Sequence, residues 1–131
     1  MYFNPNNIDY KNVLVRASAI LTTGYVAGTT IDAAQDANQL VLTINFTKGS
    51  LTTADFKVEF SNDNVTFYQE SIESFVAGVG TISLANRVLS ASGQYRIAIP
   101  ILDRYIKISA KGVGGSVAGS LMKIDAVIGT V

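Results

Sequence analysis

The sequence contains no histidine, no cysteine and no tryptophan. Without an imidazole or a thiol, Ser-His-Asp and Cys-His catalysis are excluded, and so are the usual zinc sites. Charged residues make up only 15% of the chain, below the roughly 25% of an average soluble domain, whereas 48% are hydrophobic. The composition predicts a protein that is not an enzyme, that uses no cofactor, and that has apolar surface to cover.

A net charge is also missing, because ten basic residues balance ten acidic ones. No overall field therefore favours a nucleic acid or an anionic membrane as partner. No run of about 18 apolar residues is present, and residues 1–7 show neither the basic nor the apolar region of a secretory signal. We expect no nucleic-acid partner, no membrane partner and no export through the N-terminal segment.

The acidic residues are scattered along the sequence, and only a glycosidase-type carboxylate pair stays open as a catalytic alternative. Asn62, Asp63 and Asn64 carry oxygen atoms suited to calcium, but the Gly and terminal Glu of an EF-hand loop are missing. The same residues build tight turns, because Asn and Asp tolerate positive φ. We interpret the segment as a turn with Asn64 at positive φ and predict no metal site.

Apolar residues recur with a period of two along most of the chain, which places successive side chains on opposite faces of a sheet. The alternation is clearest in 40–47, which we expect to be a central strand, whereas 25–38 is typical of a long loop. Within 80–85, Ile82 and Leu84 are expected to be buried. Eight strands are predicted in all, over residues 13–21, 40–47, 56–61, 66–70, 80–85, 94–99, 104–111 and 116–128.

The turn signals between these strands predict two hairpins, one joining 56–61 to 66–70 and one joining 94–99 to 104–111. Eight short strands without helical spacing predict an all-β fold, a two-sheet antiparallel β-sandwich of jelly-roll type, with a fibronectin-like sandwich as the alternative. We expect residues 1–12 to form an extended N-terminal arm and residues 13–131 to form a single β-sandwich domain.

Two segments carry a family resemblance: VEFSNDNVTFY at 58–68 and GQYRIAIPILDRYIKI at 93–108. Together with the final Gly-rich turn and strand, they resemble the jelly-roll cement, or head decoration, proteins of tailed bacteriophages. The same pattern is more distantly similar to discoidin-like β-sandwich modules, which bind sugars or lipids. Phe67 stands where those modules favour Trp, and their terminal Cys residues are missing, so both departures weaken a sugar-binding role.

The resemblance implies a structural virion protein that binds the outer shell of a capsid and stabilises contacts between major capsid protein subunits. Such a protein is made in the host cytoplasm, ends on the capsid surface and associates with itself as a dimer or trimer. A tail or head fibre adaptor and a carbohydrate-binding β-sandwich module remain alternatives. No chemistry is required of any residue in the first two roles, since adhesion is repeated over many copies.

Six residues are candidates for partner binding: Tyr2, Phe3, Asn4, Pro5, Tyr68 and Tyr105. The first four combine aromatic rings with Asn and Pro in a terminus that a partner would order, although the terminus could equally pack on its own sandwich. The two tyrosines are expected to face outward, where they could contact a protein or stack on a sugar, or else bury their rings with the hydroxyl at the rim. Four apolar residues on faces assigned outward suggest a further interface: Leu14, Ile20, Leu121 and Val127.

Overall fold

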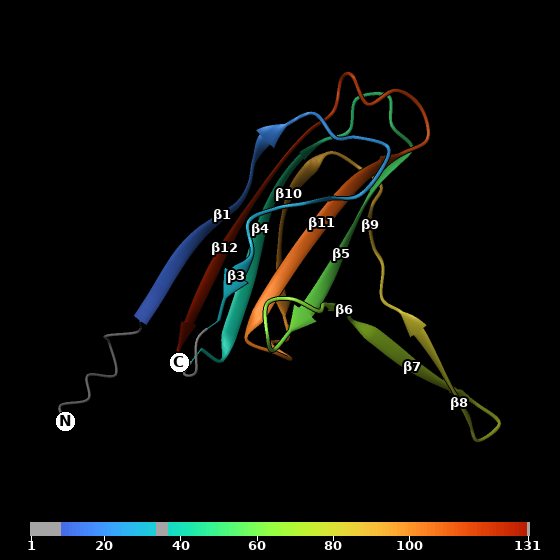
Figure 1. Ribbon diagram of the computed structural model, residues 1–131. Coiled ribbons are helices and arrows are strands. Elements are labelled where there is room, and N and C mark those ends of the chain that lie inside the picture. Colours follow the sequence, from blue (N-terminus) through green and yellow to red (C-terminus); the bar gives the residue numbers. More distant parts are fainter. Residues whose placement is uncertain (1–8, 34–36, 131) are drawn as a thin grey trace.

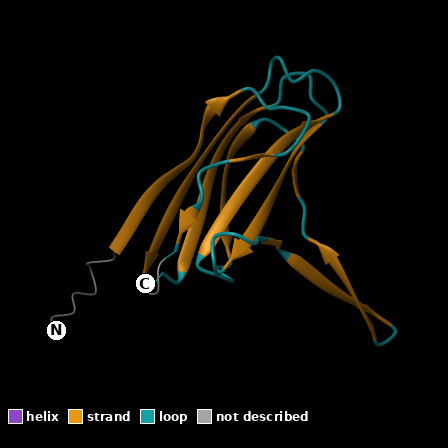
Figure 2. Cartoon of the chain, in the orientation of Figure 1, coloured by secondary structure: helices purple, strands orange, loops and turns teal. Residues whose placement is uncertain are grey.

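The computed structural model describes residues 9–33 and 37–130, and within these ranges it contains twelve strands and no helix (Figure 1, Figure 2). All strand pairs are antiparallel, which confirms the predicted all-β sandwich. In the described part of the chain, no helix is long and apolar enough to cross a membrane.

The first sheet has the strand order β1-β12-β4-β10, so β4 is central, as its alternation predicts. In the second sheet, β11 and β5 form the middle, β2 and β3 both pair with β11, and β6 and β9 both pair with β5. The strands of the first sheet are β1 (Asp9–Ala19), β4 (Gln39–Thr47), β10 (Gly93–Ile99) and β12 (Leu121–Thr130). Those of the second are β2 (Val26–Ala27), β3 (Ile31–Asp32), β5 (Thr53–Ser61), β6 (Tyr68–Gln69), β9 (Arg87–Leu89) and β11 (Tyr105–Val113).

Each sheet therefore has four strand positions, and the order in which the chain visits them is that of a jelly roll. The strand count exceeds the predicted eight for two reasons. The position beside β11 and the position on the far side of β5 are each filled by two short strands instead of one. In addition, β7 (Ser71–Val76) and β8 (Val79–Leu84) pair only with each other and form a two-stranded sheet outside the sandwich (Figure 1).

The core lies between the two sheets and consists of the inward residues of the alternating strands. In the first sheet, β12 and β4 align their apolar residues in register, for example Ile124 opposite Ile44 and Ala126 opposite Leu42. In the second sheet, Ile106 and Ile108 of β11 are almost completely buried. Because one register slip would turn all these side chains outward, the alternation fixes the pairing of the central strands.

Three details of the predicted strand pattern are wrong. Segments 94–99 and 104–111 do not form a hairpin, because β10 pairs with β4 in one sheet and β11 pairs with β5 in the other. The expected loop at 25–38 contains β2 and β3. Residues 9–12, assigned to the N-terminal arm, belong to β1 and pair with β12. In each case long-range pairing with another strand decided the structure, and such pairing leaves little local signal.

Candidate protein-docking surfaces

One edge of the second sheet is formed by a strand that is interrupted in its middle. β6 pairs with the end of β5 and β9 pairs with its beginning. Between them, the N–H of Glu70 donates to the carbonyl of Val58 on β5 at 2.9 Å. The chain leaves this edge after Glu70 and returns to it at Ala85. We call the excursion, residues 71–84, the arm; it comprises β7, β8 and their turn, and it projects from the sandwich (Figure 1).

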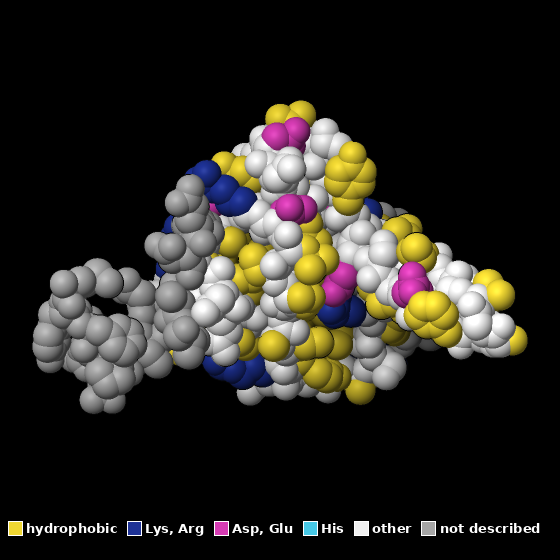
Figure 3. All heavy atoms as spheres, turned by 90° about the horizontal axis from the view of Figure 1, so that it is seen from below, with side chains coloured by type: hydrophobic (Ala, Val, Ile, Leu, Met, Phe, Trp, Pro, Cys, Tyr) yellow, Lys and Arg dark blue, Asp and Glu magenta, His cyan; other side chains and the backbone are white. Residues whose placement is uncertain are grey.

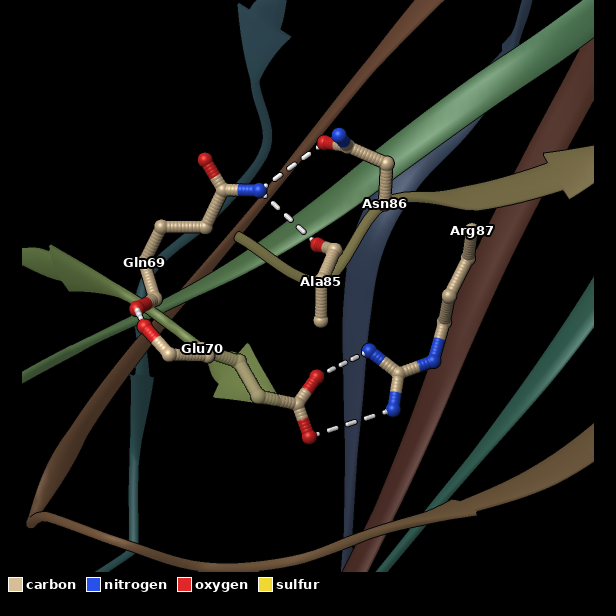
Figure 4. Close-up of polar contacts among 6 residues, drawn as sticks. Gln69, Glu70, Ala85, Asn86 and Arg87 are labelled. Carbon is tan, nitrogen blue, oxygen red and sulfur yellow. Dashed lines mark hydrogen bonds and ion pairs between the residues drawn. The ribbon is translucent and has the colours of Figure 1, made fainter. Parts of the chain in front are cut away.

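The base of the arm is closed by a cluster of polar contacts (Figure 4). The N–H of Ala85 donates to the carbonyl of Glu70 at 2.8 Å, so the two ends of the arm lie side by side. The Gln69 amide donates to the carbonyl of Ala85 at 2.8 Å and to the Asn86 side chain at 2.9 Å. The Arg87 guanidinium binds both carboxylate oxygens of Glu70, with Nη2 at 3.3 Å from Oε2. These contacts fix the direction in which the arm leaves the sheet.

The arm is a regular hairpin along its whole length. β7 and β8 pair from Ser71 opposite Leu84 to Val76 opposite Val79. The two residues of the turn, Ala77 and Gly78, have φ of 51° and 81°. Positive φ at both central residues is the geometry that matches the twist of paired strands in a two-residue turn.

The arm exposes apolar side chains on both of its faces, and Figure 3 shows them along the projection at the right of that view. Glu73 is the only charged residue of the arm. The prediction that Ile82 and Leu84 are buried is wrong, because the hairpin that carries them leaves the sandwich. The exposed fractions are 56% for Ile72, 68% for Phe75, 76% for Val76, 65% for Val79, 69% for Ile82 and 58% for Leu84.

A cleft opens between the two sheets next to the base of the arm. It has a volume of about 360 Å³ and lies between β9 and β10, the edge strands of the two sheets on this side. Phe56 and Ile44 form part of its lining, and Arg96 lies on β10 at its rim. Val88 and Ile97, which also line it, are 56% and 37% exposed. The cleft is thus a mainly apolar hollow bordered by two arginines, Arg96 and the Arg87 that binds Glu70.

Tyr68, a predicted contact residue, is 71% exposed and borders a second, polar hollow of about 250 Å³. The hollow is also lined by Asn62, Asp63, Thr66 and Asp103. Asn64 has φ of 60°, which confirms the predicted positive φ in this turn. In the described part of the chain, no group of three or more acidic side chains is placed to hold a metal ion.

The Asp63 carboxylate holds the turn together. It accepts hydrogen bonds from the N–H groups of Val65 and Thr66, both at 2.9 Å, and from the Ser61 hydroxyl at 2.8 Å. The hydrogen bonds from the backbone N–H groups of Thr66 and Val65, followed by the hydrogen bond from the Ser61 side chain, lower the pKa of Asp63 below its ordinary value. A set of donors that favours the ionised form explains this direction.

Acid should weaken this turn. Because the folded-state pKa of Asp63 lies below the unfolded value of about 3.9, its stabilisation is complete above that value and is lost as the pH falls through the folded-state pKa. We expect wild type to be more stable than Asp63→Ala at pH 7 and the gap to narrow toward pH 2 in parallel urea titrations. A gap that widens on acidification would contradict this assignment. Asp125→Ala, which removes a half-buried carboxylate on β12 that pairs with Lys123, is the control.

Tyr105, the other predicted tyrosine, is half-buried, and the Arg104 guanidinium lies 5.0 Å from the centre of its ring. The register places Tyr68 opposite Phe60 and Tyr105 opposite Ser61 on β5. Because adjacent positions of a strand face opposite sides, the two rings do not form one platform. The predicted contacts at Tyr2, Phe3, Asn4 and Pro5 lie outside the described residues.

The outer faces of the two sheets differ in character. On the second sheet, lysines cover the aromatic rings: Lys57 and Lys111 lie 4.7 and 4.6 Å from the centre of Tyr25, and Lys107 lies 4.3 Å from that of Phe67. On the first sheet, the apolar residues assigned outward do face outward, with Leu14 and Ile20 each 50% exposed, Leu121 44% exposed and Val127 half-buried. Leu14 and Val127 are diagonal neighbours across the β1–β12 pair, where Leu14 lies opposite Asp125 and Asn12 opposite Val127, whereas the arm is an apolar element that leaves the sandwich.

The arm was not among the contacts predicted from the sequence, although a local signal is present. Apolar residues flank Ala77-Gly78 on both sides, at positions 72, 75 and 76 and at positions 79, 82 and 84, and a glycine in a two-residue connection is typical of a hairpin. Between Glu73 and Arg87 the sequence has no charged residue at all. A hairpin of this composition must have its faces covered, and the sequence alone does not say whether by its own sandwich or by another chain.

No protein-family model matches the chain, and no curated protein is significantly similar to it in sequence. Among solved structures, the SPBc2 prophage-derived protein YomS is similar, with a TM-score of 0.59 and 11% identity over 98% of this chain and 100% of that chain. A structure of infectious bursal disease virus, Gx strain, gives a TM-score of 0.44 and 11% identity, over 99% of this chain and 36% of that chain. The likeness to YomS shows that the two chains share a fold.

Proposed function

We propose that this chain is a non-enzymatic structural protein of a virus particle, which cements the capsid by binding the major capsid protein on the outer shell. The arm is the observation that carries this proposal. It projects from a fixed base, and its apolar residues contribute nothing to the core of its own chain. A two-stranded hairpin is only marginally stable in water, and exposed apolar patches of this kind mark interaction sites.

The chemistry of the chain supports adhesion as its role. Without His or Cys, the usual general base and the thiol nucleophile are missing. The shared fold with a prophage-derived protein agrees with a phage setting. A cement protein acts in many copies, so even a modest contact per copy, repeated over a shell, resists outward pressure on the capsid through avidity.

Electron microscopy of particles produced with and without this chain tests the proposal. We expect additional density on the outer shell, spaced with the symmetry of the capsid lattice, only in particles that contain the chain. The matched variant replaces residues 71–84 by Asn-Gly, because the hydrogen bond from Ala85 to Glu70 is the one that closes a two-residue turn. This armless chain should fold but give no additional density on the outer shell.

The other outcomes of this experiment are equally informative. Density confined to the tail would replace the cement role by that of a tail or fibre adaptor. Particles that never contain the chain would overturn a structural role altogether. Shell density that persists with the armless variant would leave the location correct and would refute the arm as the contact.

One observation favours a second candidate function, a carbohydrate-binding module. Exposed Tyr68 stands beside the polar hollow lined by Asn62, Asp63, Thr66 and Asp103, and sugars bind where an aromatic ring adjoins hydrogen-bonding side chains. A glycan array with wild type and Tyr68→Ala tests this candidate. Binding that requires Tyr68 would support it, and an array without binding would remove it.

A further inference from the structure

The arm has one face suited to insertion into a pocket. In an antiparallel pair, opposite residues lie on the same face, so Glu73 and Ile82 share a face with Phe75 and Gly80. A Cβ at Gly80 would lie 3.0 Å from Cε1 of Phe75, which shows that the ring lies across the glycine. Phe75 is nevertheless 68% exposed. This face thus offers an aromatic anchor next to a single acid.

The cleft between β9 and β10 has the complementary properties. Its volume of about 360 Å³ admits an aromatic side chain, and its lining includes Phe56, Val88 and Ile97. β10 is an edge strand whose outer side pairs with no other strand among the described residues. Arg96 at the rim alternates with Tyr95 and Ile97, so its side chain leaves β10 on the outer face of the first sheet. It is exposed and makes no ion pair with any residue in the described part of the chain. A cation without a partner and a free strand edge thus border an apolar hollow.

We propose that the arm docks on a second copy of this chain, with Phe75 of one copy in the β9–β10 cleft of the other and Glu73 next to Arg96. The inference rests on the proposed function in treating the arm as a docking element, and it adds the identity of one partner. Charge complementarity selects this occupant, because the only acid of the arm meets the unpaired cation at the rim of the cleft.

The positions of the arm and of the cleft in the fold permit two copies to dock on each other. The arm ends next to the cleft, since β8 leads through Ala85 and Asn86 into β9, which lines the cleft. Two copies that face each other can therefore each insert an arm into the other, which gives a closed dimer, or the contact can run head to tail around a ring. Free edges of the arm and of β10 can also pair as strands in this contact.

Sedimentation equilibrium of the full chain tests the contact, beginning with its aromatic anchor. We expect wild type to self-associate below about 100 μM and Phe75→Ser to weaken association by at least about 30-fold, as for a central anchor. Val65→Ser, which alters a residue that is 80% exposed but lies outside the arm, is the matched control and should change nothing. Unchanged thermal melting of Phe75→Ser would show that its effect is not one of folding.

Charge reversal then identifies the two surfaces. Glu73→Arg and Arg96→Glu should each weaken association by about tenfold, and the double variant should regain it to within about threefold, because it restores the opposite charges. Mixing the two single variants should likewise give mixed oligomers. Self-association that is unchanged by all these substitutions, or that persists in the armless chain, would overturn the proposed contact.

The result separates this inference from the proposed function. A wild-type chain that stays monomeric at about 100 μM but binds particles through its arm would refute docking between copies and leave the cement role standing. Oligomers that depend on Phe75 and Arg96, in a chain never found in particles, would support the docking and refute the cement role.

Discussion

Replacing Ile124 by alanine should lower the free energy of unfolding by about 2–5 kcal/mol, the range for a large aliphatic residue in a packed core. Ile124 is 1% exposed and lies opposite Ile44 where β12 and β4 pair. The shorter side chain removes contacts with both sheets, and rigid neighbouring strands cannot close the space that is left. Urea unfolding followed by circular dichroism measures the change.

The matched control is Ile82→Ala, the same substitution on the arm. Ile82 also belongs to an alternating strand, but it is 69% exposed. Its truncation should change the free energy of unfolding of the monomer by less than about 0.5 kcal/mol, as at other surface sites. A loss comparable to that of Ile124→Ala would contradict the free arm and would show that the hairpin packs on its own sandwich.

These two isoleucines also explain how far the sequence could predict the structure. Alternation identifies strands and their apolar faces, and it correctly placed β4 at the centre of its sheet and the apolar residues of β12 in the core. Alternation does not indicate which surface an apolar face packs against. The same period of two in β8 led to the wrong expectation that Ile82 and Leu84 are buried, because a hairpin outside the sandwich has the same local pattern.

Strand pairing was predictable only where the connection is short. The Asn62–Asn64 turn correctly joins the segments of β5 and β6, since Asp63 and Ser61 supply its hydrogen bonds locally. The connection through Pro100 looks like another hairpin in sequence. In the structure it crosses from one sheet to the other, because β10 pairs with β4 and β11 pairs with β5. Such a crossover depends on which edges are free, and that is a property of the whole sandwich.

The candidate site was likewise predictable from the sequence only in part. The sequence placed Tyr68 among the candidate contacts and left a buried ring open as the alternative, and in the structure Tyr68 is 71% exposed. The cleft, by contrast, is formed by residues from strands of both sheets, such as Phe56 and Ile97, so no local pattern indicates it. The ion pair at the base of the arm joins Glu70 to Arg87 across the whole excursion, and it is visible only once β6 and β9 are known to share one edge.

Breaking that ion pair should have the other large effect. Arg87→Ala should lower the free energy of unfolding by about 2 kcal/mol, because it leaves the Glu70 carboxylate without its bidentate partner in a poorly hydrated position. The Glu70 side chain is only 11% exposed in the ion pair. The substitution also removes the guanidinium from its place 6.0 Å from the centre of the Phe56 ring.

A double-mutant cycle separates the pair from the loss of packing. Glu70→Ala, Arg87→Ala and the double variant should show a coupling energy of about 1–2 kcal/mol, since removing both charges leaves neither one unpaired. Amide exchange at Ala85, whose N–H bonds to the carbonyl of Glu70, should accelerate in both single variants. Strictly additive losses with unchanged exchange at Ala85 would mean that the ion pair does not hold the base of the arm. The arm's direction would then depend on the backbone bond and the Gln69 amide alone.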